Sequence, residues 1–162
     1  MSATADAPGR LDRLARGFAL AGAAMACAVG LMVVASVLGR ALLSTPIPGD
    51  VELTQFGIAV AISLGLPWCQ SRRANIRVDF FTTGVAARTQ RRLDAVGMLM
   101  LALMCLLLAW RSGAGAVAVW EARETSMILA LPMWWTYALL APGLALTALL
   151  ALVQAVHELR GP

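Results

Sequence analysis

The sequence is poor in the residues on which most catalytic and metal-binding sites depend. Its 162 residues include no lysine, three cysteines and a single histidine, His157. Cys27, Cys69 and Cys105 lie in three different apolar runs and form no CxxC pair, so we expect small packing residues rather than a disulfide framework or a metal site. A haem-carrying helical bundle is also excluded, because His157 alone, in the C-terminal tail, cannot supply inward-facing ligands.

Charge is scarce as well. Charged residues make up 14% of the chain and hydrophobic residues 60%, which is too apolar for a soluble fold of this length. The formal net charge of +4 would suit a nucleic-acid-binding protein, but the arginines cluster at the ends of apolar runs. That placement is typical of membrane topology and not of a phosphate-binding surface, so no nucleic-acid partner is expected.

The apolar runs have no acidic residue near their centres. A proton-coupled four-helix exporter needs such a carboxylate, because the charge must bind protons and cationic substrate alternately. The pair of broken helices and the inverted repeat typical of secondary transporters are missing too. The residue types present cannot form a catalytic set of nucleophile, base and orienting group, and the sequence has no phosphate-binding loop. We therefore expect neither an enzyme nor a cofactor, and a protein unable to transport by itself.

What the sequence does contain is four apolar segments long enough to cross a bilayer. The first has 23 uncharged residues at 17–39, against the ~20 that span hydrocarbon. A cleaved signal peptide is the weaker alternative, because its apolar core has only about 7–15 residues. The pattern predicts one all-α integral membrane domain over 1–162, with helices at about 15–40, 51–70, 93–120 and 131–157.

The arginines predict that both termini are cytoplasmic. Ten of the thirteen lie in the N-terminal tail, the loop at 71–92 and the C-terminal tail, whereas Arg40, Arg111 and Arg123 fall on the opposite side. Positively charged loops are retained on the cytoplasmic side of a membrane. The basic loop also interleaves apolar and charged residues, which favours an interfacial helix at 76–92 in the headgroup layer.

Several residues are expected to anchor the helices in the bilayer. Arg111 lies ~27 Å along its helix from Leu93, so it is close to the far interface, where a guanidinium can extend into the headgroups. Anchoring, or pairing with a nearby glutamate, is favoured over transport chemistry for Arg111. The predicted anchoring residues are Arg72, Arg73, Arg77, Trp110, Arg111, Trp134 and Trp135.

Small residues recur every four positions in the first two helices. Such a stripe lets two helix backbones approach closely, within the chain or with a partner. The predicted packing residues are Gly22, Ala26 and Gly30 in the first helix, and Gly57, Ala61 and Gly65 in the second.

Acidic residues lie at the outer ends of the helices. Asp50 is predicted to be the N-cap of the second helix, and Glu52 to complement the helix dipole in its first turn. This structural role is favoured for Glu52 over that of a functional carboxylate. Glu121 and Glu124 lie in the connection between the last two helices.

Three stretches carry recognisable motifs: the acidic start of the second helix, GDVELTQFGIAVAISLG; the basic loop SRRANIRVDFF, with its Val-Asp pair; and ETSMILALPMWWTYALLAPG. In these stretches the chain resembles the small membrane subunit of tripartite ATP-independent periplasmic (TRAP) transporters. Together with the helix pattern, the resemblance covers most of residues 15–157. Asn75 stands where the loop motif of the family has His, so a titratable role there is not expected. The third motif matches through Glu124, Pro132, Trp134, Tyr137, Pro142 and Gly143.

The resemblance implies a multi-pass scaffold subunit in the bacterial inner membrane. It would pair with a large membrane subunit that holds the substrate and sodium sites, while a periplasmic binding protein delivers an organic acid. Asp50, Glu52, Glu121 and Glu124 would then cap helices or dock the binding protein on the outer face. The alternative is a free-standing four-helix membrane protein that regulates or senses without an obligate large partner.

Overall fold

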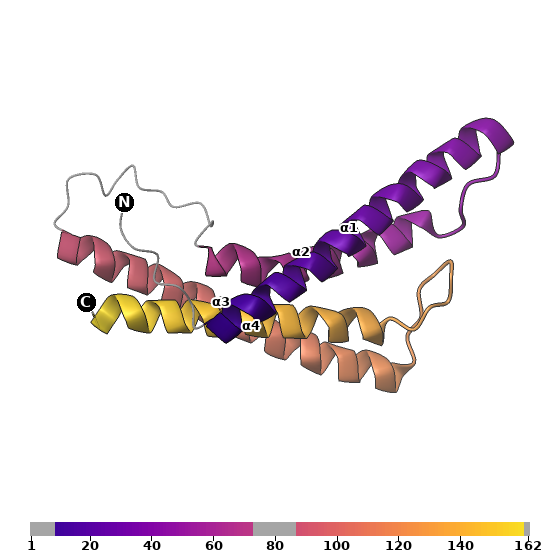
Figure 1. Ribbon diagram of the computed structural model, residues 1–162. Helices are drawn as coiled ribbons and strands as arrows, with labels where there is room; N and C mark the ends of the chain where they lie inside the picture. Colours follow the sequence, from indigo (N-terminus) through magenta and orange to yellow (C-terminus); the bar gives the residue numbers. More distant parts are fainter. Residues whose placement is uncertain (1–8, 73–86, 161–162) are drawn as a thin grey trace.

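The computed structural model describes residues 9–72 and 87–160, and four α-helices form this part of the chain (Figure 1). All four are long and apolar enough to cross a membrane. The predicted all-α, four-helix membrane fold is therefore confirmed. Arg73, Arg77 and most of the predicted interfacial helix lie outside the described residues. The helices are α1 (Gly9–Leu43), α2 (Asp50–Ser71), α3 (Ala87–Ala122) and α4 (Trp134–Arg160).

Two helices extend beyond their predicted bounds. α1 begins at Gly9 instead of about residue 15, and α3 begins at Ala87 instead of about residue 93. Arg91 and Arg92, predicted to lie in the basic loop, are thus helical. Arginine is a good helix former, and a helix can continue beyond the hydrocarbon into the headgroup layer. The change from apolar to charged residues marks the edge of the membrane and not the end of the helix.

α4 begins later than predicted, at Trp134 instead of about residue 131. Pro132, which falls inside the helix predicted at about 131–157, precedes α4 and forms an isolated antiparallel bridge with Thr125. The amide of Met133 donates to the carbonyl oxygen of Glu124 at 3.1 Å. The connection between α3 and α4 is therefore closed by its own backbone pairing, and α4 begins only after this pairing ends.

The four helices form a row of two hairpins. α1 packs on α2 and α3 packs on α4, while α2 and α4 join the two pairs; among the described helices, α3 contacts only α4 (Figure 1). Large apolar side chains on the outer helices are consequently exposed, with Leu31 at 72% and Trp110 at 76%. In a membrane, lipid or another protein's helices can cover such surfaces.

We call the end of the molecule with residues 43–50 and 122–134 the loop end. The opposite end, with the start of α1 and the end of α4, is the terminal end (Figure 1). The predicted cytoplasmic arginines that the structure describes belong to the terminal end, and the four predicted outer acids to the loop end.

Candidate functional site: helix seams and the loop end

The seam between α1 and α2 is a close backbone contact. A Cβ atom added to Gly22 would lie 2.8 Å from the carbonyl oxygen of Ala61 and 3.3 Å from the backbone nitrogen of Gly65. A Cβ atom on Gly57 would overlap the side chain of Val29. Only small residues allow helices to approach this closely. Four of the six predicted packing positions therefore lie in an internal seam.

Ala26 and Gly30 lie outside this seam. Both are exposed, and a Cβ atom on Gly30 would meet nothing within 4 Å. Residues four positions apart differ by ~40° in direction about the helix axis, whereas residues seven apart differ by only ~20°. A stripe with a spacing of four therefore soon leaves the contact face. The buried residues of α1 do recur every seven positions: Ala15, Gly22, Val29 and Ser36.

The seam between α2 and α4 combines close packing with hydrogen bonds between the helices. A Cβ atom on Gly143 would overlap the backbone of Ser63, whose hydroxyl donates to the carbonyl oxygen of Leu140 at 2.7 Å. Near the terminal end, Gln70 Nε2 donates to Gln154 Oε1 at 2.8 Å, and Gln154 Nε2 donates to the carbonyl oxygen of Gln70 at 2.9 Å. Both glutamines are buried.

The Gln70–Gln154 contact is not predicted by the sequence. The available signal was one polar amide near the end of each apolar segment, because buried polar groups need partners. The pairing of these two residues, 84 positions apart, depends on how α2 and α4 cross.

Asp50 does not occupy its predicted N-cap position. The N-cap of α2 is Gly49, with a φ of 73° and no capping side chain, although Asp50 Oδ1 accepts from the first-turn amide of Val51 at 2.8 Å. Asp50 is the first helical residue, and its carboxylate accepts from the Ser36 hydroxyl at 2.6 Å and lies 3.5 Å from Arg40. The N-cap prediction is wrong, because the left-handed conformation of Gly49 starts the helix one residue earlier. Asp50 instead links α2 to α1.

Glu52 also makes internal contacts. Its Oε1 accepts from the amide of Ile128 at 2.9 Å and its Oε2 from the amide of Leu129 at 3.3 Å. A carboxylate that accepts from backbone amides forms strong, charge-assisted hydrogen bonds. Glu52 thus fastens the α3–α4 connection to the start of α2, and both of its oxygens are engaged within the chain.

The α3–α4 connection is closed by further bonds. The amide of Ser126 donates to the carbonyl oxygen of Leu131 at 2.9 Å, and the amide of Leu131 donates to the Ser126 hydroxyl at 3.3 Å. Its tip carries Met127, 99% exposed, and Ile128, 62% exposed. The connection is a short, internally bonded hairpin with an apolar tip.

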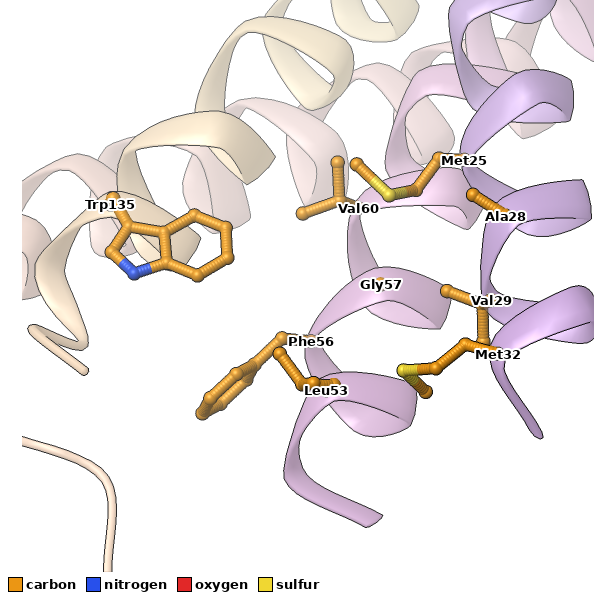
Figure 2. A pocket seen from close by; sticks show the side chains of 9 residues that line it. All are labelled: Met25, Ala28, Val29, Met32, Leu53, Phe56, Gly57, Val60 and Trp135. Atoms are coloured by element: carbon orange, nitrogen blue, oxygen red, sulfur yellow. The ribbon is translucent and has the colours of Figure 1, made fainter. Parts of the chain in front are cut away.

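An apolar groove opens between α1, α2 and the start of α4 (Figure 2). Its volume is about 210 Å³, and the rings of Phe56 and Trp135 meet edge to face at its loop end, 6.1 Å apart. No charged side chain lines it, so it can take only apolar groups. The lining residues are Met25, Ala28, Val29, Met32, Leu53, Phe56, Gly57, Val60 and Trp135.

Of the predicted anchoring residues that the structure describes, Arg72 and Trp134 lie near the ends of the molecule, whereas Trp110 and Arg111 lie well inside α3. Arg72 places its guanidinium 4.3 Å from the ring centre of Trp68 and 3.5 Å from the Asp12 carboxylate. Trp134 meets the ring of Trp120 edge to face at 5.0 Å. Trp110 and Arg111 are exposed on α3. In the described part of the chain, no group of three or more His, Cys, Asp or Glu residues could hold a metal ion.

Four spanning helices, close small-residue seams and a bonded hairpin at one end define a small multi-pass membrane protein. A family model described as the DctQ component of tripartite ATP-independent periplasmic transporters matches residues 29–161. The chain belongs to this family, which confirms the resemblance seen in the sequence. It is the small membrane component of a TRAP transporter, located in the inner membrane, and not an enzyme. No curated protein and no solved structure matches the chain.

Proposed function

We propose that this protein is the fixed scaffold of a TRAP transporter that takes up an organic acid. In this role it pairs with a large membrane subunit, which moves the substrate. Substrate binding is carried out by that subunit and by a periplasmic binding protein. Membership of the family supports the transporter role. The choice of an organic acid rests on the resemblance noted in the sequence.

The observation that carries the scaffold role is the way α2 is tied to the second hairpin along its whole length. Glu52 binds the hairpin at the loop end, Ser63 binds the α4 backbone near the middle, and Gln70 binds Gln154 near the terminal end. Three separated contacts prevent α2 from sliding or rotating against α4. A subunit held in this way suits a fixed support better than a moving carrier.

The exposed faces of α1 and α3 support pairing with another membrane protein. Each of these two helices packs mainly on one neighbour, and both display rows of leucine, valine and methionine. Ala26 and Gly30, which the α1–α2 seam does not use, allow a partner helix to approach α1 closely. We assign these two residues to the contact with the large subunit.

Glu121 is our candidate for contact with the binding protein. Asp50 and Glu52 are engaged inside the chain, and Glu124 lines a pocket at the end of α3. Glu121 is exposed at the loop end, the outer end in the proposed topology. Charge reversal, Glu121→Arg, should slow binding-protein-dependent uptake and leave co-purification of the large subunit unchanged. Normal uptake by this variant would contradict the assignment.

Pairing is tested by purifying the tagged full-length protein from native membranes. Recovery of a larger multi-helix membrane protein in stoichiometric amount, together with loss of organic acid uptake when the gene for this chain is deleted, is the expected result. Recovery of this chain alone, with normal uptake in the deletion strain, would favour a free-standing regulatory protein.

A further inference from the structure

A second pocket, distinct from the apolar groove, lies at the loop end where α3 stops. Its volume is about 330 Å³, and it contains one cation, Arg123, and one anion, Glu124. The edge-to-face pair of Trp120 and Trp134 contributes aromatic surface. The full lining is Val119, Trp120, Arg123, Glu124, Thr125, Pro132 and Trp134.

The backbone at Arg123 is unusual for the residue that occupies it. The amide of Arg123 donates to the carbonyl oxygen of Trp120, and the amide of Glu124 donates to that of Val119, both at 3.2 Å. This is the Schellman arrangement that ends many helices, and its left-handed residue is usually glycine. Arg123 occupies that position with a φ of 51°, which is strained for a residue with a side chain. Ser44 and Ala130 have similar φ angles, so the conformation alone assigns no role to the side chain, but glycine would form this turn at least as well and the turn does not require the guanidinium.

Both charges in the pocket are available to a ligand. Within the part of the chain that the structure describes, neither the Arg123 guanidinium nor the Glu124 carboxylate makes a hydrogen bond or ion pair. The two residues are adjacent and line the same pocket, yet they do not pair with each other. The site therefore presents a cationic and an anionic group side by side, which suits a ligand carrying both charges.

The surroundings indicate that this ligand is amphiphilic. The pocket lies at the end of α3, a helix long and apolar enough to span a membrane. Trp120, which lines the pocket, is 60% exposed, and Val117, one turn earlier on α3, is 58% exposed. Tryptophan side chains commonly lie at the level of lipid headgroups, where the ring is in apolar surroundings and the N–H is hydrated. The charged part of the pocket thus continues directly into the exposed apolar surface of α3.

We propose that this pocket binds the headgroup of a zwitterionic phospholipid with a primary ammonium, such as phosphatidylethanolamine. The Arg123 guanidinium faces the phosphate, a pairing that allows two parallel hydrogen bonds. The Glu124 carboxylate accepts from the ammonium, which the tryptophan rings also attract. The acyl chains run along the exposed side of α3 past Val117. Phosphatidylglycerol, whose headgroup ends in neutral hydroxyls, would leave the Glu124 carboxylate without a counter-charge, so the site discriminates between headgroups.

The experiment measures lipid bound to the purified full-length protein by intact-mass spectrometry in detergent, during titration with phosphatidylethanolamine or phosphatidylglycerol. The wild-type protein should bind phosphatidylethanolamine more tightly. Glu124→Gln should weaken that binding about tenfold, because a charge-assisted hydrogen bond is lost. Binding of phosphatidylglycerol should not fall. Glu121→Gln is the matched control, and should leave both lipids unaffected.

Arg123→Gly separates lipid binding from the structure of the turn. Glycine relieves the backbone strain, so the melting temperature of the lipid-free protein should stay the same or rise, while binding of both lipids falls. Arg123→Lys should retain more of the binding than Arg123→Gly. A merely structural role for Arg123 predicts the opposite, with lower stability and unchanged lipid binding.

Two results would overturn the proposal. One is equal binding of the two lipids by the wild-type protein and by Glu124→Gln. The other is that Glu124→Gln weakens binding of the soluble binding protein but not of lipid, which would make the pocket a protein contact. Neither result bears on the scaffold role, which is tested by co-purification of the large subunit.

Discussion

Two glycines on the same helix have opposite surroundings. Gly22 touches the backbone of α2, whereas Gly30, eight residues later, faces open space. The positions look alike in the sequence, because both belong to one stripe of small residues. They therefore allow the same substitution to be compared at an internal contact and at a free surface.

Gly22→Leu should destabilise the isolated protein. The side chain would push α1 away from Ala61 and Gly65, and overpacking of this kind costs about 1–3 kcal/mol. Gly30→Leu should leave the stability unchanged. Thermal unfolding of the two purified variants in detergent checks this, and equal melting temperatures would contradict the assigned seam.

Gly30→Leu should instead weaken pairing with the large subunit. The added side chain would occupy the surface that we assign to the partner helix, next to Ala26. The measurement is the amount of large subunit recovered with the tagged variant. Unchanged recovery would remove α1 from the proposed interface without affecting the internal seam.

Glu52→Ala should loosen the α3–α4 hairpin. The amides of Ile128 and Leu129 lose their acceptor, so their hydrogen exchange should become faster. Glu121→Ala, which removes an acid that these amides do not contact, is the control. If exchange at the two amides were the same in wild type and Glu52→Ala, the hairpin would be held by its own pairing alone.

Among the helices, α2 is one of two inner elements, because it contacts both α1 and α4. Its buried residues accordingly face two directions. Gly57 packs on α1, Ser63 packs on α4, and Gln70 bonds to Gln154. A helix with two contact faces does not display a single apolar stripe, which is why spacing alone did not identify the α4 side.

The Gln70–Gln154 bond can be tested with a double-mutant cycle. Gln70→Leu and Gln154→Leu should each destabilise the protein, by about 0.6–1.7 kcal/mol if they behave like other hydrogen bonds between membrane helices. Each single change removes a hydrogen-bond partner of a buried amide, so the double variant should cost less than the sum of the two. Additive losses in unfolding free energy would show that the two amides act independently.

The helix ends were predicted less well than the helices. Hydropathy locates the part of a helix that lies in hydrocarbon, and α1 and α3 continue several residues beyond it. The start of α4 depends on the pairing of Thr125 with Pro132, a contact between two ends of a loop. Neither a continuation into the headgroups nor a loop closure is marked by a change in apolar character.

For the whole molecule, the proposed orientation can be tested by labelling introduced cysteines. The arginine distribution predicts that the terminal end is cytoplasmic. In a variant with Cys27, Cys69 and Cys105 replaced by alanine, Glu121→Cys should react with an impermeant maleimide in intact cells. Arg91→Cys should react only after the membrane is opened. The reverse pattern would invert the molecule, and with it the proposed contact between Glu121 and the binding protein.

The amino-acid order alone was sufficient to define the class of the protein, the number of spans and the family. These properties depend on local features, such as the length of an apolar run, the positions of arginines and short motifs. Such features can be recognised without knowledge of the tertiary contacts. The tertiary structure decided which small residues meet, that Asp50 and Glu52 bind within the chain, and that Arg123 and Glu124 share a pocket with two tryptophans. Those outcomes depend on the crossing of helices far apart in sequence and on the path of one loop, because the rotation of each helix about its axis is set by its neighbours and not by its own residues.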